Sequence, residues 1–262
     1  MPNLHRCLFW LILSIGLAAF IPTASAALND SGQATCYDGS GYVACTEANT
    51  GDSSPYPRQD GRYGRDAQAR AGQLSKTGGG EAGFDFTALN ASGQPTTPSS
   101  GATPHPCVRD NVTGLMWEVK TADGGLRDQK WTYTWYDSNT ATNGGAVGVA
   151  SGVTNCLTSG RCDTEKYAAD VNAAGLCGFR DWRVPTREEL LSIVHDGRVN
   201  PSIDVTYFPN TPATWYWTSS SDASDSSSAW LVAFGNGLVS YGYRSGGGGV
   251  RLCARGTVTF VF

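Results

Sequence analysis

Residues 181–197 read DWRVPTREELLSIVHDG and give the clearest local signal for the fold. Thr186 and Glu189, three positions later, have the spacing of a capping box, in which each side chain accepts a hydrogen bond from a backbone N–H at the start of a helix. The stretch predicts a strand over 182–184, a helix that begins after Thr186, and a helix stop at Gly197. Apolar residues at helical spacing form the buried stripe of this helix, namely Leu190, Leu191 and Val194.

A second helix is predicted over residues 164–174, TEKYAADVNAA. These residues favour a helix, and Tyr167 and Val171 stand four positions apart, so their side chains lie on one face. Gly175 follows directly and supplies the stop, because glycine adopts the left-handed conformation that ends many helices.

Strands are predicted where aromatic and β-branched residues alternate or cluster between turn signals. The segments are CVRDNVTGLMWEVK (107–120), WYWTSS (215–220), AWLVAFGNGLVSYGY (229–243) and VRLCARG (250–256). The third is a hairpin that turns at residues 235–237, Gly-Asn-Gly, and carries Trp230, Val232 and Phe234 on one face. Strands and helices in this order, ending in an antiparallel meander, predict an α+β domain.

The first 26 residues have the three-part layout of a secretory signal peptide. Arg6 precedes the apolar run 7–20, and Pro22 and the small residues 24–26 follow it. Because the run is shorter than the roughly 20 residues of a membrane-spanning helix, cleavage before Ala27 is favoured over a membrane anchor. We therefore predict an exported mature chain, periplasmic, at the cell surface or secreted, that does not span the membrane.

The amino-acid composition of the predicted mature chain changes at about residue 106. Residues 27–106 are rich in Gly, Ser, Thr, Pro and Asp, and within them only 84–95 predict a strand and a turn, so we expect a loop-rich extension. Residues 107–256 carry the α+β domain, and 257–262 form a short tail. The net charge of the whole chain is −4, and with no basic stripe in the sequence we expect no nucleic-acid partner.

Export permits disulfide bonds. The chain has 8 cysteines, of which Cys7 leaves with the signal peptide, so an odd number remains and at least one thiol is unpaired or intermolecular. Cys36 and Cys45 flank YDGSGYVA, a turn-rich sequence that predicts a small stapled hairpin. Cys156 and Cys162 enclose LTSGR, and because this pair lacks a second pair of metal ligands, a disulfide is favoured over zinc.

A third bridge has two possible pairings. Cys107 with Cys177 would tie the first strand of the domain to the segment that leads into the next predicted strand. Cys107 with Cys253 would instead join the first and last strands of the domain. We favour Cys107 with Cys177, which leaves Cys253 over, but sequence alone does not exclude the second pairing.

Several motifs follow one another in an order that resembles a known family. They are DNVTGLMWE (110–118), AGLCGFRDWRVPTREELLSIV (174–194), YFPNTP (207–212), WTSSS (217–221), AW (229–230) and VRLCARG (250–256). Together they resemble the Lcl C-terminal domain family over residues 107–256. The resemblance implies a C-type-lectin-like fold, in which two helices pack on short antiparallel sheets, and a role in binding or adhesion at the cell surface.

The resemblance implies an extracellular glycan or protein as partner. The collagen-like adhesin that names the family is associated with sulfated polysaccharides, but the acidic balance of this chain argues against a polyanion. The lectin-like superfamily also contains formylglycine-generating enzymes, which use a closely spaced cysteine pair near the C-terminus, where this chain has Cys253 alone. His105, in the linker, and His195, expected on the surface at a helix end, lie in no catalytic pattern.

We therefore expect a binding protein and no enzyme. A structural protein of the cell envelope is the second hypothesis, and an enzyme of the formylglycine-generating type the third. We predict neither a cofactor nor a metal. Asp222, Asp225 and Asn236 offer oxygen atoms that calcium accepts, but the paired carboxylate and amide motifs of calcium-dependent lectins are absent, so solvated loop residues are favoured.

Aromatic residues are assigned mainly to the core. Four tryptophans lie in predicted strands beside other apolar residues: Trp117, Trp182, Trp217 and Trp230. Trp215 and Tyr216 precede Trp217 in an alternating strand, so at least one of them faces the opposite way. These two are the better aromatic ligand candidates.

The predicted recognition surface lies in residues 219–249, about two thirds of which are Ser, Gly, Tyr, Asp or Asn, the residue types that dominate adaptable binding loops. By the resemblance, this stretch occupies the place of the variable region of retroelement-diversified lectin-like proteins. Arg244 adds the only positive charge of the stretch, and the Gly/Asn-rich insertion 143–154 is the alternative site. The predicted ligand contacts are Ser224, Asp225, Ser226, Ser227, Ser228, Asn236, Ser240, Tyr241, Tyr243, Arg244 and Ser245.

Overall fold

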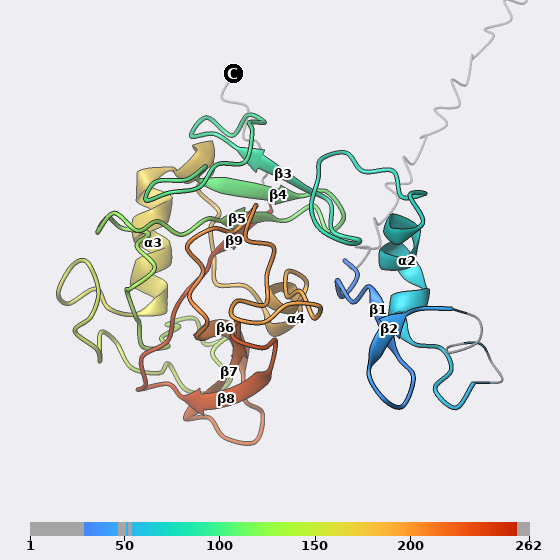
Figure 1. Ribbon diagram of the computed structural model, residues 1–262. Coiled ribbons are helices and arrows are strands. Elements are labelled where there is room, and N and C mark those ends of the chain that lie inside the picture. Colours follow the sequence, from blue (N-terminus) through green and yellow to red (C-terminus); the bar gives the residue numbers. More distant parts are fainter. Residues whose placement is uncertain (1–28, 47–50, 52–53, 256–262) are drawn as a thin grey trace, which may run out of the picture.

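The computed structural model describes residues 29–46, 51 and 54–255. The predicted signal peptide and the tail 257–262 lie outside the described residues. The structure has a larger body with a four-stranded and a three-stranded sheet and the helices α3 and α4. Figure 1 shows a smaller lobe beside it, formed by the N-terminal segment. Within the part of the chain that the structure describes, no helix is long and apolar enough to cross a membrane.

The first sheet of the body contains strands from both ends of the domain. It has the order β3 (Phe86–Leu89), β4 (Cys107–Asp110), β5 (Met116–Glu118), β9 (Cys253–Ala254), and all neighbours are antiparallel. β3 comes from the segment that the sequence assigned to the loop-rich extension. The sheet therefore begins before the boundary expected at residue 107, and the strand predicted within 84–95 is part of the domain.

The second sheet is the predicted meander at the other end of the body (Figure 1). β6 (Trp215–Ser221), β7 (Ser228–Ala233) and β8 (Val239–Tyr243) pair antiparallel in that order. The β7–β8 hairpin turns at residues 235–237, as predicted, and Gly237 has φ 75° there, a conformation that glycine adopts without strain. At β6 both faces of the sheet pack into the interior, because Tyr216 and the adjacent Trp217 belong to different core clusters.

Helix α3 (Thr164–Ala174) has the predicted bounds, and the short 3-10 helix η2 (Leu176–Gly178) follows it. The Asp163 side chain caps the start of α3 by accepting a hydrogen bond from Lys166 N–H. Gly175 ends the helix in the left-handed conformation, as the sequence predicted.

Helix α4 (Arg187–Leu191) begins with the predicted capping box but is shorter than expected. It ends at Ser192, so the predicted stop at Gly197 is wrong. Backbone N–H groups beyond the helix bond to other segments, since His195 N–H donates to Ser202 O and Asp196 N–H donates to Ser31 O. These tertiary bonds replace the helical ones and draw the chain out of the helix.

The N-terminal lobe contains β1 (Thr35–Tyr37) and β2 (Tyr42–Ala44), the stapled hairpin, followed by two helices that the sequence pattern did not indicate. These are the 3-10 helix η1 (Asp60–Arg62) and α2 (Gly64–Arg70). A remote carboxylate, Asp30, accepts a hydrogen bond from an N–H in the first turn of α2, at Asp66, as a local cap residue would. A cap supplied by a residue so distant in the sequence cannot be predicted from the residues around the helix.

The three expected disulfides are formed: Cys36–Cys45, Cys107–Cys177 and Cys156–Cys162. Cys107 therefore pairs with Cys177 and not with Cys253, which lies in β9 and is separated from β4 by β5. Among the cysteines that the structure describes, Cys253 is the free one, and it is buried. The α+β class, with two helices and short antiparallel sheets in the domain, is confirmed.

Candidate functional site

A groove of about 540 Å³ opens between the loop 135–142, the first turn of α3, the segment before α4 and the end of β6. Two buried tryptophans, Trp135 and Trp182, form its deepest part. The ring N–H of Trp135 donates to Thr218 O at 2.8 Å, and that of Trp182 donates to Leu176 O at 3.1 Å. Both rings are thus fixed by the core, and the base of the groove is rigid.

The loop that forms one wall of the groove is bonded to α3. Tyr136 N–H donates to Thr164 Oγ1 at 2.9 Å, and the same hydroxyl donates back to Tyr136 O at 2.8 Å. One turn along the loop, Ser138 N–H donates to Glu165 Oε2 at 2.7 Å. These bonds hold the two walls at a fixed separation.

Polar side chains line the upper part of the groove. Asp137 accepts hydrogen bonds from Asn139 N–H and from the Thr142 hydroxyl, at 2.9 and 2.6 Å. On the opposite wall, Ser219 and Ser220 of β6 are half-buried and face the groove. The groove therefore combines an aromatic base with hydroxyl, amide and carboxylate groups above it, a composition typical of ligand sites.

An ion pair supports the wall next to α4. Arg183 donates two hydrogen bonds to Glu189, at 2.7 and 2.6 Å, and Glu189 also caps the Thr186 N–H. Burial opposes the ionisation of Glu189, but the bonds from Arg183 and Thr186 outweigh it and hold the pKa of Glu189 below its ordinary value. Arg183 is thus neutralised by a partner outside the groove.

The remaining charges on the groove are negative. Asp137 and Glu165 both line it, and within residues 29–46, 51 and 54–255 neither forms a salt bridge. With Arg183 paired to Glu189, the groove presents an acidic surface to a ligand.

The predicted ligand contacts other than Asn236 lie in and around the β6–β7 loop and the end of β8, beside this groove, and the structure divides the whole set into three groups by exposure. Exposed residues are Ser224, Ser226, Ser227, Asn236, Tyr241, Tyr243 and Ser245; Asp225 and Ser240 are half-buried; Ser228 and Arg244 are buried. The loop between β6 and β7 lies next to the end of β8, because Arg244 N–H donates to Ser227 O. We call the exposed residues at this end the hairpin surface: Ser224, Ser226, Ser227, Tyr241, Tyr243 and Ser245.

Arg244 is buried, so the structure does not place it on the exposed surface where the sequence predicted a ligand contact. Its side chain is 2% exposed, with the guanidinium 3.9 Å from the centre of the Trp135 ring. It donates to Ser228 O and to Asn143 O, each at 3.0 Å, and also to Ala146 O. Arg244 is therefore a structural link that holds the insertion starting at Asn143 against the base of the groove.

Ser228 and Trp230 also differ from their predictions. Ser228 is 1% exposed and donates its hydroxyl to Asp225, so it stabilises the loop before β7 and is not available to a ligand. Trp230 was expected in the core but is half-buried at the surface. The Arg187 guanidinium lies 4.9 Å from the centre of the Trp230 ring, and the Tyr241 ring contacts Trp230 edge-on, with the two ring centres 6.1 Å apart.

The two other aromatic candidates lie apart from the hairpin surface. Tyr216 is buried, whereas Trp215 is 38% exposed. Trp215 lines a separate hollow at the opposite end of the β7–β8 hairpin together with Asn236. Asn236 is therefore not brought together with Tyr241 and Tyr243.

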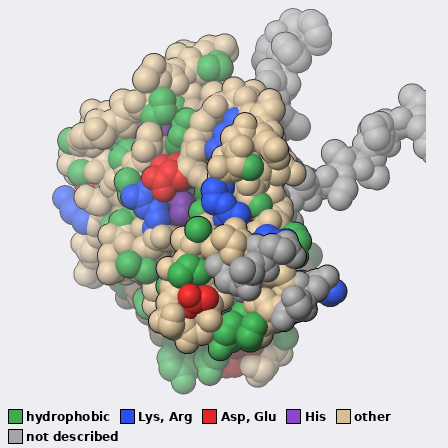
Figure 2. Space-filling model, turned by 45° about the vertical axis from the view of Figure 1, so that its right-hand side comes forward, with side chains coloured by type: hydrophobic (Ala, Val, Ile, Leu, Met, Phe, Trp, Pro, Cys, Tyr) green, Lys and Arg blue, Asp and Glu red, His purple; other side chains and the backbone are tan. Residues whose placement is uncertain are grey.

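Both described histidines are buried, which corrects the surface position expected for His195. Its Nε2 lies 3.2 Å from Glu81 Oε2, and its ring packs 5.4 Å from Phe84. His105 Nε2 lies 2.9 Å from Tyr207 O. Burial lowers the pKa of both histidines. Figure 2 shows this face of the molecule, on which acidic, basic and histidine side chains adjoin one another.

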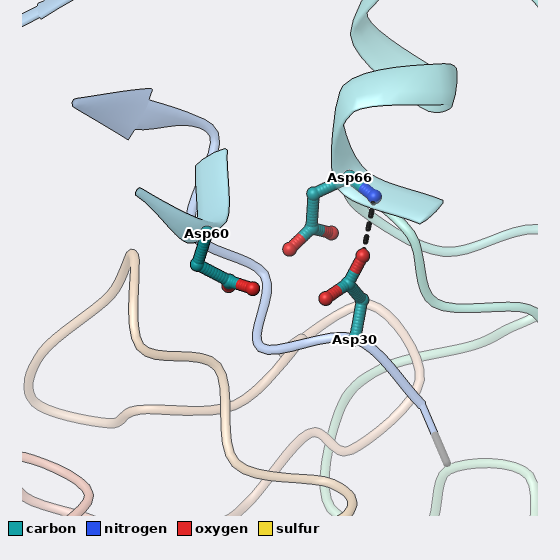
Figure 3. A group of neighbouring side chains, drawn as sticks. All are labelled: Asp30, Asp60 and Asp66. Atoms are coloured by element: carbon teal, nitrogen blue, oxygen red, sulfur yellow. Dashed lines mark hydrogen bonds between the residues drawn. The ribbon is translucent and has the colours of Figure 1, made fainter. Parts of the chain in front are cut away.

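A group of three carboxylates lies in the N-terminal lobe, away from the loop acids considered as calcium ligands. Asp30, Asp60 and Asp66 place their oxygens within 4.8 Å of one another (Figure 3), a donor set that suits a hard cation. Burial raises the pKa of Asp66, and the negative charges of Asp30 and Asp60 raise it further. The hydrogen bond from Gly83 N–H lowers this pKa but does not cancel the increase. These contacts also join the segment around Asp30 to α2.

The loop acids themselves stabilise turns. Asp222 accepts hydrogen bonds from the backbone and hydroxyl of Ser224, and Asp225 does the same with Ser227. Turns of this composition are commonly stabilised in this way, by an aspartate that accepts hydrogen bonds from the residue two positions ahead.

The groove was missed at the level of sequence because its lining comes from four separate segments of the chain. Its one local signal is the motif DWRVPT, residues 181–186, which supplies Trp182 and Thr186 to the lining. The hairpin surface could be predicted from the sequence, because its residues all lie in one stretch, 219–249, whose composition is unusual.

The comparisons with known proteins bear on the domain alone. A search of the curated proteins found no match to this chain. The model of the Lcl C-terminal domain family matches residues 106–254, which include the groove, the hairpin surface and all but β3 of the two sheets. This match covers more than half of the 262 residues, and the chain therefore belongs to the Lcl C-terminal domain family.

Proposed function

We propose that the protein is an exported ligand-binding protein, and not an enzyme, that recognises an extracellular glycan or protein with the groove and the hairpin surface. The C-type-lectin-like relationship implied by the sequence motifs is part of this proposal. Export is supported by the signal-peptide layout of residues 1–26 and by the three disulfides, which persist in oxidising compartments.

The observation that carries the proposal is the continuity of the two surfaces. Ser220, on the groove wall, accepts a hydrogen bond from Arg187 N–H at 3.1 Å. The Arg187 side chain covers Trp230, and Trp230 contacts Tyr241 of the hairpin surface. A ligand in the groove can thus extend over an aromatic ridge onto exposed tyrosines and serines, the residue types that supply adaptable contact area.

The environment of Cys253 supports binding over catalysis. Burial raises the pKa of the Cys253 thiol to about 12, and its sulfur lies 3.8 Å from Glu189 Oε2. A thiol in this state is a poor nucleophile at neutral pH, because the thiolate is the reactive form. The residue is better explained as part of the core beneath the Arg183–Glu189 pair.

The proposal is tested with the mature protein, residues 27–262, on glycan and protein arrays. We expect reproducible binding that is lost when Ser219→Trp, Tyr241→Ala and Tyr243→Ala are combined. A matched control combines Ser92→Trp, Tyr42→Ala and Tyr63→Ala, which change exposed residues outside both surfaces. Absence of binding to any array member, or unchanged binding by the folded combined variant, would reject the proposal and favour a structural envelope protein.

A further inference from the structure

We propose that the groove binds an uncharged sugar ring of a glycan, an inference that rests on the ligand-binding function proposed above. The alternative occupant is a basic side chain of a protein partner. Four properties of the groove decide between them: its hydrogen-bonding groups, its apolar lining, its charge and its rigidity.

The hydrogen-bonding groups include both donors and acceptors. Within the described chain, Asn139 uses its carbonyl oxygen to accept from Ala141 N–H, while its amide NH2 has no partner. Glu165 accepts at one carboxylate oxygen and leaves the other open. The Ser219 backbone N–H donates to Pro185 O, and within the described chain its hydroxyl has no hydrogen-bond partner. Sugar hydroxyls donate and accept at once, so they match such a mixed set, whereas an ammonium or guanidinium group only donates.

The apolar lining complements the other side of a sugar ring. Tyr136, Ala168 and Val184 are half-buried along the groove, above the buried Trp182. A pyranose ring has an apolar C–H face and a rim of hydroxyls, so it can contact this strip and the polar groups at the same time. The volume of about 540 Å³ falls within the range of about 300–1,000 Å³ that encloses small ligands and exceeds that of one monosaccharide.

The charge of the groove excludes acidic sugars. Asp137 and Glu165 carry negative charge, and the positive charge of Arg183 is offset by Glu189 at 2.6 Å. Arg244, which interacts with Asp137, is buried behind the lining and is not exposed to a ligand. A sulfate or uronate group here would face like charges without a free cation on the lining, which is destabilising. The site therefore selects neutral rings over the sulfated ones associated with the adhesin that names the family.

The rigidity of the groove suits a small polar ligand. Arg244 and the reciprocal bonds between Tyr136 and Thr164 fix the loop 135–142 before a ligand arrives. A sugar offers little apolar area, so its binding depends on groups that lose little freedom when it binds.

The experiment titrates the mature protein with neutral hexose and N-acetylhexosamine oligosaccharides, with their sulfated and uronate-containing counterparts, and with lysine- and arginine-rich peptides. We expect binding of a neutral oligosaccharide whose affinity changes less than about twofold between low salt and about 0.5 M NaCl. Binding of a basic peptide, with a loss of about tenfold or more in high salt, would overturn the inference. Preference for the sulfated counterparts would overturn it as well.

Two variants locate the ring. Ser219→Trp fills the groove and should weaken neutral-sugar binding by about tenfold or more, while Ser92→Trp should leave it unchanged. Asn139→Asp keeps the oxygen that accepts from Ala141 N–H but removes the amide donor, and it should cost about fivefold or more without disturbing the fold. If the array detects a ligand and both variants bind it normally, the groove inference falls and the proposed function stands. If the array detects none, both fall.

Discussion

The groove and the hairpin surface adjoin each other but are built in opposite ways. The groove rests on buried residues that are hydrogen-bonded to the surrounding backbone, such as Trp135, Trp182 and Arg244. The hairpin surface consists of side chains with few contacts, among which Tyr241 and Tyr243 are 60% and 71% exposed. Changes in the buried base of the groove should therefore disturb the fold, whereas changes in the hairpin surface should affect recognition alone.

The largest expected effect comes from the base of the groove. Trp182→Ala should destabilise the domain by about 3–5 kcal/mol, because it removes a buried aromatic side chain and leaves a cavity. Chemical denaturation measures the change, and Trp215→Ala, which alters a partly exposed tryptophan on β6, serves as the control. A Trp182→Ala protein as stable as the wild type would show that the ring is not part of the core.

Arg244→Ala should have the next largest effect, about 3 kcal/mol, because the carbonyls of Ser228 and Asn143 lose a charged donor in the interior. Arg244→Lys is the informative companion, since a single ammonium group cannot replace a planar fork of donors. We expect it to recover only part of the stability. If Arg244→Ala instead melts like the wild type and loses ligand binding, the original assignment of Arg244 to the ligand would be restored.

The environment of Arg244 could be predicted from the sequence only in part. Strand alternation places residue 244 on the face opposite Tyr241 and Tyr243, a relation that was available from the sequence. What the sequence did not show is that the opposite face is covered by Trp135 and by the carbonyls of the insertion that begins at Asn143. The residue was assigned by its charge, whereas its environment depends on a contact a hundred positions away.

Elements with a local cause were predictable. The capping box of α4 and the Gly175 stop of α3 follow from adjacent residues, and both occur as expected. Helix α2 was missed because its first turn is bonded by Asp30, far away in sequence. The groove, like α2, depends on residues that are distant in the sequence, and no single one of its four segments indicates a cavity.

The Arg183–Glu189 pair predicts a pH dependence of stability. The pKa of Glu189 is lower in the folded protein than its ordinary value of 4.5, so its contribution to stability is present above pH 4.5 and is lost as the pH falls through the folded pKa. The melting temperature of the wild type should therefore exceed that of Glu189→Gln at pH 7, and the gap should narrow below pH 4.5.

The neighbouring Glu188 provides the control for this titration. Its carboxylate is 62% exposed and pairs with Arg187 at the surface, so Glu188→Gln should produce a smaller gap at neutral pH. A gap for Glu189→Gln that stays constant from pH 7 to pH 3 would mean that the ion pair does not stabilise the groove wall.

The smallest effect on stability is expected at the hairpin surface, where the effect on binding should be large. Tyr241 and Tyr243 lie on one face of β8, opposite Trp230 and Ser228 in the register of the sheet. Replacing both tyrosines by Ala should change the free energy of unfolding by less than about 1 kcal/mol, since only the edge contact of Tyr241 with Trp230 is lost.

Affinity for the ligand found on the arrays should fall by about tenfold or more in the same double variant, because tyrosines often carry a large share of interface energy. Tyr42→Ala, at a residue 74% exposed on β2, controls for the loss of an exposed ring. If the tyrosine variant unfolds, the hairpin surface is structural and its contrast with the groove disappears. If it folds and binds normally while Ser219→Trp does not bind, recognition is confined to the groove, and the exposed serines and tyrosines beside it are free to vary without loss of the ligand.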